Sequence, residues 1–229
     1  MIKFNLVVGA LGDQKADAIV TAATQELNPL SDYYSDVLEK AGPELHRDII
    51  ENSYSCEIGD ALVTSAFNLD ADVIVHAVPP SLDSDEDNGM SLVATYANAI
   101  IIGYEEGDAR TFVVPPLGLN SGNQHMKGLA TLAYDGLFLG IGQCPFIKEV
   151  TLCMPNEAFS AVFEHVFKNE LKKGWFFGPS CPKCGNPAVP ITYGLTSRED
   201  LTDPNFYAGG CIVWAESPDW ACRGCGVEF

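Results

Sequence analysis

The run Asp72-Val-Ile-Val-His-Ala-Val78 shows no polar alternation apart from His76, and this pattern is typical of a β-strand covered on both faces. The stretch Asp17-Ala-Ile-Val-Thr-Ala-Ala-Thr24 contains a second apolar run of the same kind. Further strands are expected at residues 2–8, 60–67, 111–114 and 148–154.

Helical patterns separate these expected strands. In residues 31–54, apolar side chains recur at steps of three and four residues, which predicts helical structure. Two more helices are expected at about 90–104 and 126–139, and Asn156 is placed to cap a final helix with one apolar stripe. Strands that alternate with helices predict an α/β fold with a parallel or mixed sheet between helices.

The charge balance narrows the classes of partner. Acidic residues number 31 against 13 basic ones, and the formal net charge is −18. Nucleic acids and anionic membranes are recognised by clustered Lys and Arg, so neither is expected as a partner. No apolar run approaches the ~18 residues of a transmembrane helix, and residues 1–5 lack the features of a signal peptide. We therefore expect a cytoplasmic protein whose thiols stay reduced.

The distribution of cysteines indicates two domains. Three of the eight lie in the first 178 residues, and five lie in the last 51. From the Gly174–Ser180 stretch onward, Cys, Gly, Pro and Trp replace helical periodicity. We therefore expect an α/β domain over residues 1–174 and a small β-rich module over residues 175–229.

Two copies of the pattern C-x-x-C-G stand in the C-terminal module, one at Cys181 and Cys184, the other at Cys222 and Cys225. Each is a knuckle in which a tight turn brings two thiolates onto one ion, and the following glycine lets the backbone close. Four thiolates complete the tetrahedral shell of a structural Zn²⁺ and leave no open position for catalysis. The alternatives are redox dithiols or core cysteines that bind no metal. Cys211 could replace one ligand or pack beside the site as a buried thiol.

Residues 181–226 resemble small zinc-ribbon domains, a resemblance that implies no activity. Three stretches of the first domain resemble the ADP-ribose-binding macrodomain family. The first is residues 17–24, which resemble the family's DAIVNAAN strand and loop. The second is the pair of stretches 59–69 and 73–79, which resembles two consecutive strand motifs of the family. The third is Val114-Pro-Pro-Leu-Gly-Leu-Asn-Ser-Gly122, which resembles the strand and Gly-rich loop around the distal ribose and phosphates. The resemblance spans about residues 1–172 and implies a mixed sheet between helices.

The resemblance also implies a nucleotide site at the C-terminal ends of the strands, as the general rule for open α/β sheets requires. The residues it points to as ligand contacts are Thr21, Thr24, Gly118, Leu119, Asn120, Ser121, Gly122 and Asn123. The diphosphate would lie against backbone N–H groups of residues 118–123, a loop that leads into a helix. His125, directly after this loop, is a further candidate contact, whereas His76 is expected to be a core histidine.

This chain departs from the family pattern at several contacts. The Asp that receives the adenine amino group is Ala10 here, with Asp13 as a substitute candidate, and the two asparagines of NAAN are Thr21 and Thr24. The Gly-rich GGGVD loop is replaced by residues 29–34, which should reshape the site. For catalysis, Asp32 or Asp36 could orient water as a general base.

Two functions follow from these features. The first is binding of ADP-ribose or a related NAD-derived nucleotide, with hydrolysis of ADP-ribosyl linkages if one of the two aspartates activates water. The alternative is a non-catalytic adaptor, in which a degenerate macrodomain and the zinc ribbon dock a protein partner. Nucleic-acid binding through the ribbon is disfavoured, because residues 179–229 hold three basic and six acidic side chains.

Overall fold

A computed structural model describes residues 2–82, 88–119, 126–172, 181–184, 188–193, 207–208, 217–218, 220–222 and 224–229. The elements of the first domain are β1 (Lys3–Val8), the 3-10 turn η1 (Leu11–Asp13), β2 (Ala18–Ala22), α1 (Asp32–Ala41), α2 (Pro43–Asn52), β3 (Ala61–Ser65), β4 (Val73–Ala77), α3 (Gly89–Glu105), β5 (Thr111–Val114), α4 (Met126–Gln143), β6 (Glu149–Met154) and α5 (Glu157–Lys172). The C-terminal residues form β7 (Val189–Thr192), β8 (Tyr207–Ala208) and β9 (Trp220–Ala221).

Six strands form one mixed sheet in the order β1-β6-β5-β2-β4-β3. All neighbours run parallel except β3, which pairs antiparallel with β4 at the edge. Every residue of β2 is buried, and four of the five residues of β4 are buried, as the uninterrupted apolar runs predicted. The expected mixed α/β sheet between helices is therefore confirmed.

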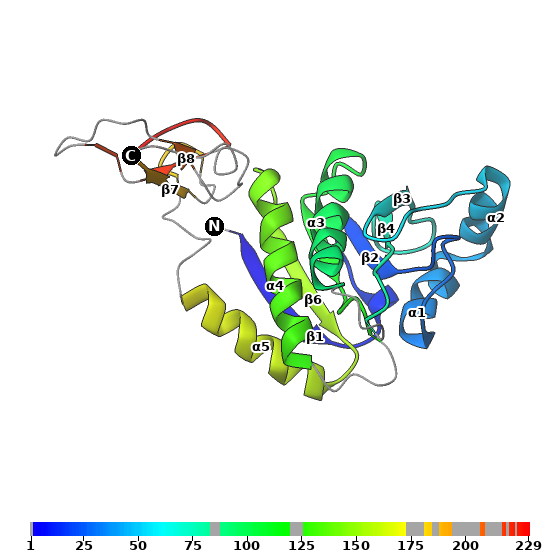
Figure 1. The fold of residues 1–229 in the computed structure, drawn as a ribbon. Coiled ribbons are helices and arrows are strands. Elements are labelled where there is room, and N and C mark those ends of the chain that lie inside the picture. The colour runs from blue at the N-terminus through cyan, green and yellow to red at the C-terminus, as the bar shows by residue number, and fades with distance from the viewer. Residues whose placement is uncertain are drawn as a thin grey trace.

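The helices flank this sheet. Figure 1 shows α3 and α4 side by side across the sheet, with α5 next to α4 and with α1 and α2 at the opposite end of the domain. The helical region expected over residues 31–54 is divided in two at Gly42, whose φ of +91° favours glycine. Pro43 follows in the first turn of α2, where its missing N–H costs nothing. Asn156 caps α5 as predicted, since its Oδ1 accepts from the N–H groups of Ala158 and Phe159 at 3.0 and 3.2 Å.

None of the helices in the described part of the chain has both the length and the apolar composition needed to cross a bilayer. The expected domain junction at residues 174–180 lies outside the described residues. The C-terminal strands form a small sheet of their own in the order β8-β7-β9. This short β-structure and its cysteine cluster fit the expected zinc-ribbon-like module.

Asp17 joins the starts of three strands. Its carboxylate Oδ2 accepts from the backbone N–H groups of Arg110 and Thr111, both at 2.8 Å, and its carbonyl oxygen accepts from the N–H groups of Asp72 and Val73. Partial burial by itself raises the pKa of Asp17, but these hydrogen bonds to the charged form outweigh it and hold the pKa below its usual value.

We expect Asp17→Asn to lower the free energy of unfolding by about 1–2 kcal/mol at neutral pH, because a neutral amide accepts these bonds more weakly than a carboxylate. A carboxylate with a lowered pKa in the folded state contributes stability that is complete above its unfolded pKa of about 4. This contribution disappears as the pH falls through the folded pKa. Urea unfolding at pH 7 and below pH 4 measures the difference. Asp72→Asn, an exposed neighbour, is the control, and an equal loss at both pH values would contradict the assignment.

Candidate functional site

The chain reverses direction across the sheet at β2. After β2 it forms the edge strand β3 and then β4 on one side of β2, and from β4 it crosses to β5 on the other side. In open α/β sheets, such a switch point leaves a crevice outside the C-terminal ends of the strands, because the following loops diverge there. The loops after β2, β4 and β5 therefore define the place where a ligand site is expected.

A hollow of about 630 Å³ lies at this point. Its described lining comes from the loop after β2, the loop after β4, the loop after β5 and the segment before β3: Ala23, Thr24, Gln25, Glu26, Leu30, Ser31, Ile58, Val78, Pro79, Pro80, Ser81, Leu82, Gly118 and Leu119. No Lys or Arg occurs among these described lining residues. A phosphate bound here would thus depend on neutral donors, namely backbone N–H groups and the hydroxyl and amide side chains of the lining.

The N-terminus of α1 borders the hollow at Ser31. The first N–H groups of a helix have no acceptors within the helix, and the helix dipole favours an anion near them. This short run of backbone donors is suited to a phosphate even though the Gly-rich loop of the family pattern is absent.

Two buried tyrosines fix the loop after β5, which forms one wall of the hollow. The hydroxyl of Tyr34, on α1, donates to the carbonyl oxygen of Pro116 at 2.6 Å. The N–H of Leu117 donates to the hydroxyl of Tyr96, on α3, also at 2.6 Å. Both tyrosine side chains are at most 1% exposed, so these bonds are shielded from water and hold the wall rigidly.

The hollow is not blocked by the aromatic residues that replace the Gly-rich loop. Tyr33 and Tyr34 are absent from its lining. The Tyr33 hydroxyl instead donates to the carbonyl oxygen of Cys153 at the end of β6, at 2.8 Å, and Tyr34 lies beneath the loop after β5. The altered loop therefore leaves space at the switch point.

The structure brings together three of the nucleotide contacts expected from the sequence, Thr24, Gly118 and Leu119. Thr21 lies in the middle of the buried sheet, with no exposed surface, and does not line the hollow. The remaining expected contacts, Asn120, Ser121, Gly122 and Asn123, and also His125, lie outside the described residues.

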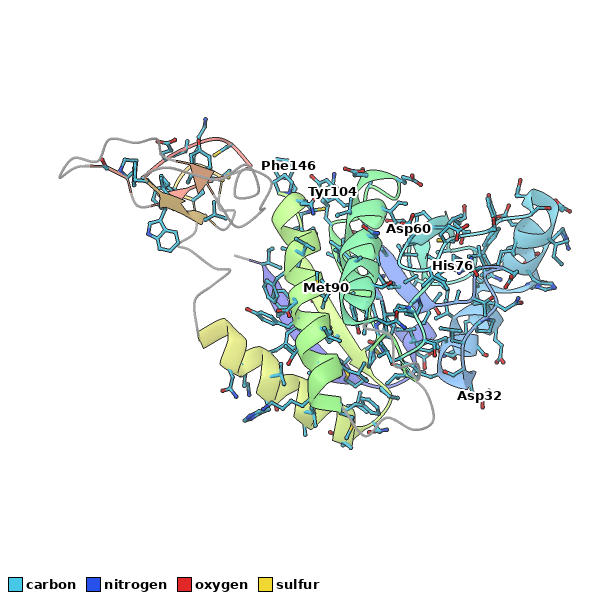
Figure 2. The ribbon with its side chains drawn as sticks, in the orientation of Figure 1. Asp32, Asp60, His76, Met90, Tyr104 and Phe146 are labelled. Atoms are coloured by element: carbon cyan, nitrogen blue, oxygen red, sulfur yellow. The ribbon has the colours of Figure 1, made fainter. Side chains whose placement is uncertain are left out.

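The two aspartates considered for catalysis, Asp32 and Asp36, are not among the described lining residues, although Asp32 directly follows Ser31. Asp32 is exposed in the first turn of α1, and Figure 2 shows it at the outer tip of that helix. Asp36 is held in place, because its Oδ2 accepts from the Gly12 N–H at 2.7 Å and its Oδ1 pairs with Lys40 at 2.9 Å. Lys40 also pairs with Asp13 at 2.7 Å, so these charges tie η1 to α1.

His76 is a core residue, as expected. It has no exposed surface, lies on β4 among the strands (Figure 2), and its Nε2 lies 2.9 Å from the Thr64 hydroxyl. Burial lowers the pKa of His76 to about 4, because the imidazolium form cannot be solvated there. This histidine is therefore neutral at physiological pH.

Several residues of the hollow were not singled out in the sequence. Glu26 and Gln25 follow Thr24 directly, and Leu30 and Ile58 form an apolar rim with 42% and 56% of their surfaces exposed. Only their positions, in the loop after β2 and in the segment before β3, could have indicated that they line a ligand site. These positions match no family motif, so the sequence did not predict them as contacts.

The four knuckle cysteines converge in the C-terminal module. Their sulfur atoms all lie within 4.8 Å of one another, with Cys181–Cys225 at 3.5 Å and Cys184–Cys222 at 3.4 Å. Tetrahedral zinc with bonds of about 2.3 Å requires sulfur separations of about 3.8 Å, whereas a disulfide requires about 2 Å. Gly226, at φ +69°, lets its N–H reach the Cys222 carbonyl oxygen at 2.7 Å and closes the second knuckle. The donor set therefore fits a metal ion. Cys211 lies outside the described residues.

Comparison with known proteins identifies one family. A sequence profile described as Macro domain matches residues 14–132, slightly more than half of the chain. A macro domain-containing protein of Listeria monocytogenes is 31% identical over 103 residues, which is 43% of this chain and 58% of that protein. The chain thus matches less than two thirds of that relative's length. An O-acetyl-ADP-ribose deacetylase of Enterobacter cloacae is 23% identical over 160 residues, 68% of this chain and 88% of that enzyme.

Solved structures show the same fold. The Oceanobacillus iheyensis macrodomain with ADP superposes with a TM-score of 0.65 at 21% identity, covering 73% of this chain and 91% of that one. The Trypanosoma brucei macrodomain in complex with ADP-ribose gives 0.63 at 17% identity, covering 72% and 68%.

Proposed function

Since this chain belongs to the macro domain family, we propose that it binds ADP-ribose or a related NAD-derived nucleotide in the hollow at the switch point. One observation carries the proposal: the hollow is formed by the loops that follow the motif-bearing strands β2, β4 and β5. The macrodomains named as complexes with ADP and with ADP-ribose share this fold and support the choice of ligand.

The diphosphate would lie between the N-terminus of α1 and the loop that begins at Gly118. Neutral donors, with backbone N–H groups foremost among them, would hold it, because no described lining residue is cationic. The strongly acidic chain offers little long-range attraction for a polyanion, so contacts within the hollow must supply the affinity.

Isothermal titration calorimetry with ADP-ribose tests this function. We expect a dissociation constant on the order of 1–100 μM, which Ser31→Trp weakens at least tenfold because the indole fills the mouth of the hollow. Glu39→Trp, two turns further along α1 on an exposed position, is the matched control and should bind like the wild type. Absence of heat with ADP-ribose, NAD and AMP would refute the proposal and favour the adaptor hypothesis.

Hydrolysis is the second part of the proposed function. The deacetylase relative acts, by its name, on O-acetyl-ADP-ribose, which is an ester. We propose that this chain likewise hydrolyses esters of ADP-ribose, either small acyl esters or ADP-ribose linked to a carboxylate side chain.

For the C-terminal module we propose a structural Zn²⁺ held by Cys181, Cys184, Cys222 and Cys225. The sulfur separations and the closed second knuckle support it. Four thiolates leave no open coordination position, so the ion would stabilise the module and take no part in hydrolysis. Docking of a protein partner is the role we propose for the module.

A further inference from the structure

Glu26 is the one ionisable side chain in the described lining of the hollow. Its carboxylate is exposed at the mouth, in the loop that follows the central strand β2. The neutral lining residues cannot accept a proton from water at physiological pH. A reaction that requires a base therefore has a single candidate in the described part of the site.

The turn that carries Glu26 is held rigidly. The Thr24 N–H donates to the Asn28 carbonyl oxygen at 2.7 Å, and the Leu27 N–H donates to the Thr24 carbonyl oxygen at 2.9 Å. Leu27 is buried, at 1% exposure, and has a φ of +62°, a conformation that a leucine seldom adopts. Such strain persists only where the surroundings enforce it, and it concentrates at functional sites.

Thr24 orients the carboxylate within this turn. Its hydroxyl donates to Glu26 Oε2 at 2.9 Å and accepts from the Asn28 N–H at 3.3 Å. The backbone donor fixes the hydroxyl, and the hydroxyl fixes one carboxylate oxygen. No donor among the described residues bonds the other oxygen, Oε1, which is therefore available for a water molecule. A base oriented by a third group is the arrangement that nucleophile activation requires.

We propose that Glu26 is the general base of the hydrolytic reaction and that Thr24 is its positioning residue. This inference rests on the proposed function. Glu26 removes a proton from water while the water oxygen attacks the ester carbonyl carbon of the bound ligand. The tetrahedral intermediate then breaks the bond between that carbon and the ribose oxygen, which takes the proton back from Glu26. The products are a carboxylic acid and ADP-ribose, and Glu26 is regenerated.

The composition of the hollow favours ester cleavage over cleavage at the ribose carbon. Glycosidic hydrolysis generally uses two carboxylates on opposite sides of the bond, one as acid and one as base or nucleophile. The described lining offers one carboxylate, which is enough for attack on a carbonyl. Leu30 and Ile58 at the rim provide apolar surface against which an acyl chain can lie.

The full-length protein is assayed with O-acetyl-ADP-ribose and, separately, with a peptide that carries ADP-ribose esterified to a glutamate. We expect Glu26→Gln to lower kcat about 100-fold or more while ADP-ribose binds as in the wild type, because the amide keeps the size but cannot accept the proton. Thr24→Val should lower kcat less and keep KM, since the base remains but loses its orientation. Glu39→Gln, an exposed carboxylate on α1 outside the lining, should leave both constants unchanged.

Water labelled with oxygen-18 identifies the bond that breaks. We expect the label in the released carboxylic acid, and label in the ribose would overturn the proposal. It would also be overturned if the wild type bound ADP-ribose but hydrolysed neither ester, or if Glu26→Gln retained wild-type kcat. These results leave binding intact and so differ from failure of the proposed function, in which ADP-ribose itself does not bind. The two substrates show whether small acyl esters or modified protein are the source of the ester.

Discussion

Cys184→Ser is expected to reduce the zinc content from about one ion per chain to a small fraction and to unfold the C-terminal module. Structural zinc sites contribute on the order of 10–16 kcal/mol of apparent binding free energy, and this energy is folding energy because the site does not exist in the unfolded chain. A module of about 50 residues buries too little apolar surface to compensate for that loss.

Tryptophan fluorescence reports on this module selectively, because all three tryptophans, Trp175, Trp214 and Trp220, lie in residues 175–229. Removal of the metal by a chelator, or by Cys184→Ser, should shift their emission to longer wavelength. The far-ultraviolet circular dichroism should change little, because the described helices all belong to the first domain.

Cys56→Ser is the control for this experiment. Cys56 is a buried thiol of the α/β domain, and burial raises its pKa to about 11, so it stays protonated and is unsuited to bind metal. Zinc content near one in this variant and near zero in Cys184→Ser would support the site. Wild-type protein purified with less than about 0.1 zinc per chain, and unchanged in fluorescence after zinc is added, would refute it.

Gly136→Ala is expected to lower the free energy of unfolding by about 2–3 kcal/mol, because overpacking of a closely packed core costs this much. Gly136 lies where α4 contacts α3. A Cβ atom there would stand 2.5 Å from the Val93 carbonyl oxygen and 2.6 Å from the Tyr96 Cβ. Backbone cannot move aside as a flexible side chain can, so the two helices must separate. Tyr96 also holds the loop after β5, and ADP-ribose binding should weaken together with stability.

Gly128→Ala is the same substitution on the same helix, at an exposed position with no atom within 4 Å of the added Cβ. It should raise stability by about 0.5–1 kcal/mol, because alanine has the higher helix propensity and reduces the freedom of the unfolded chain. Thermal or urea unfolding of both variants measures the contrast. Equal effects of the two substitutions would show that the distance between α3 and α4 does not depend on Gly136.

The features that sequence could predict depend on local patterns. Strand β5 was predicted with its observed bounds, and the other five strands of the sheet with bounds within one to two residues, because continuous apolar runs between polar turns are unambiguous. The cysteine cluster was predicted by the two C-x-x-C-G repeats, since each pattern spans only five residues. The division of residues 31–54 into α1 and α2 was not predicted, although Gly42-Pro43 was a visible signal for it.

The candidate site was only partly predictable. Motif resemblance pointed to Thr24, Gly118 and Leu119, and these residues do line the hollow. Resemblance also pointed to Thr21, which the buried centre of the sheet excludes from the surface. Glu26 matches no motif, and only the conformation of its turn in the folded chain shows that it lines the hollow.

The sequence alone thus determined the α/β class, the family and the cysteine cluster, because each depends on spacing along the chain. Tertiary structure decided where the hollow lies and which side chains face it. The strand order places the loops after β2, β4 and β5 together although their outermost residues, Ala23 and Leu119, lie 96 positions apart in the chain. The packing between helices determines which residues of these loops line the hollow. This packing produces no repeating pattern of apolar residues from which the sequence could predict it.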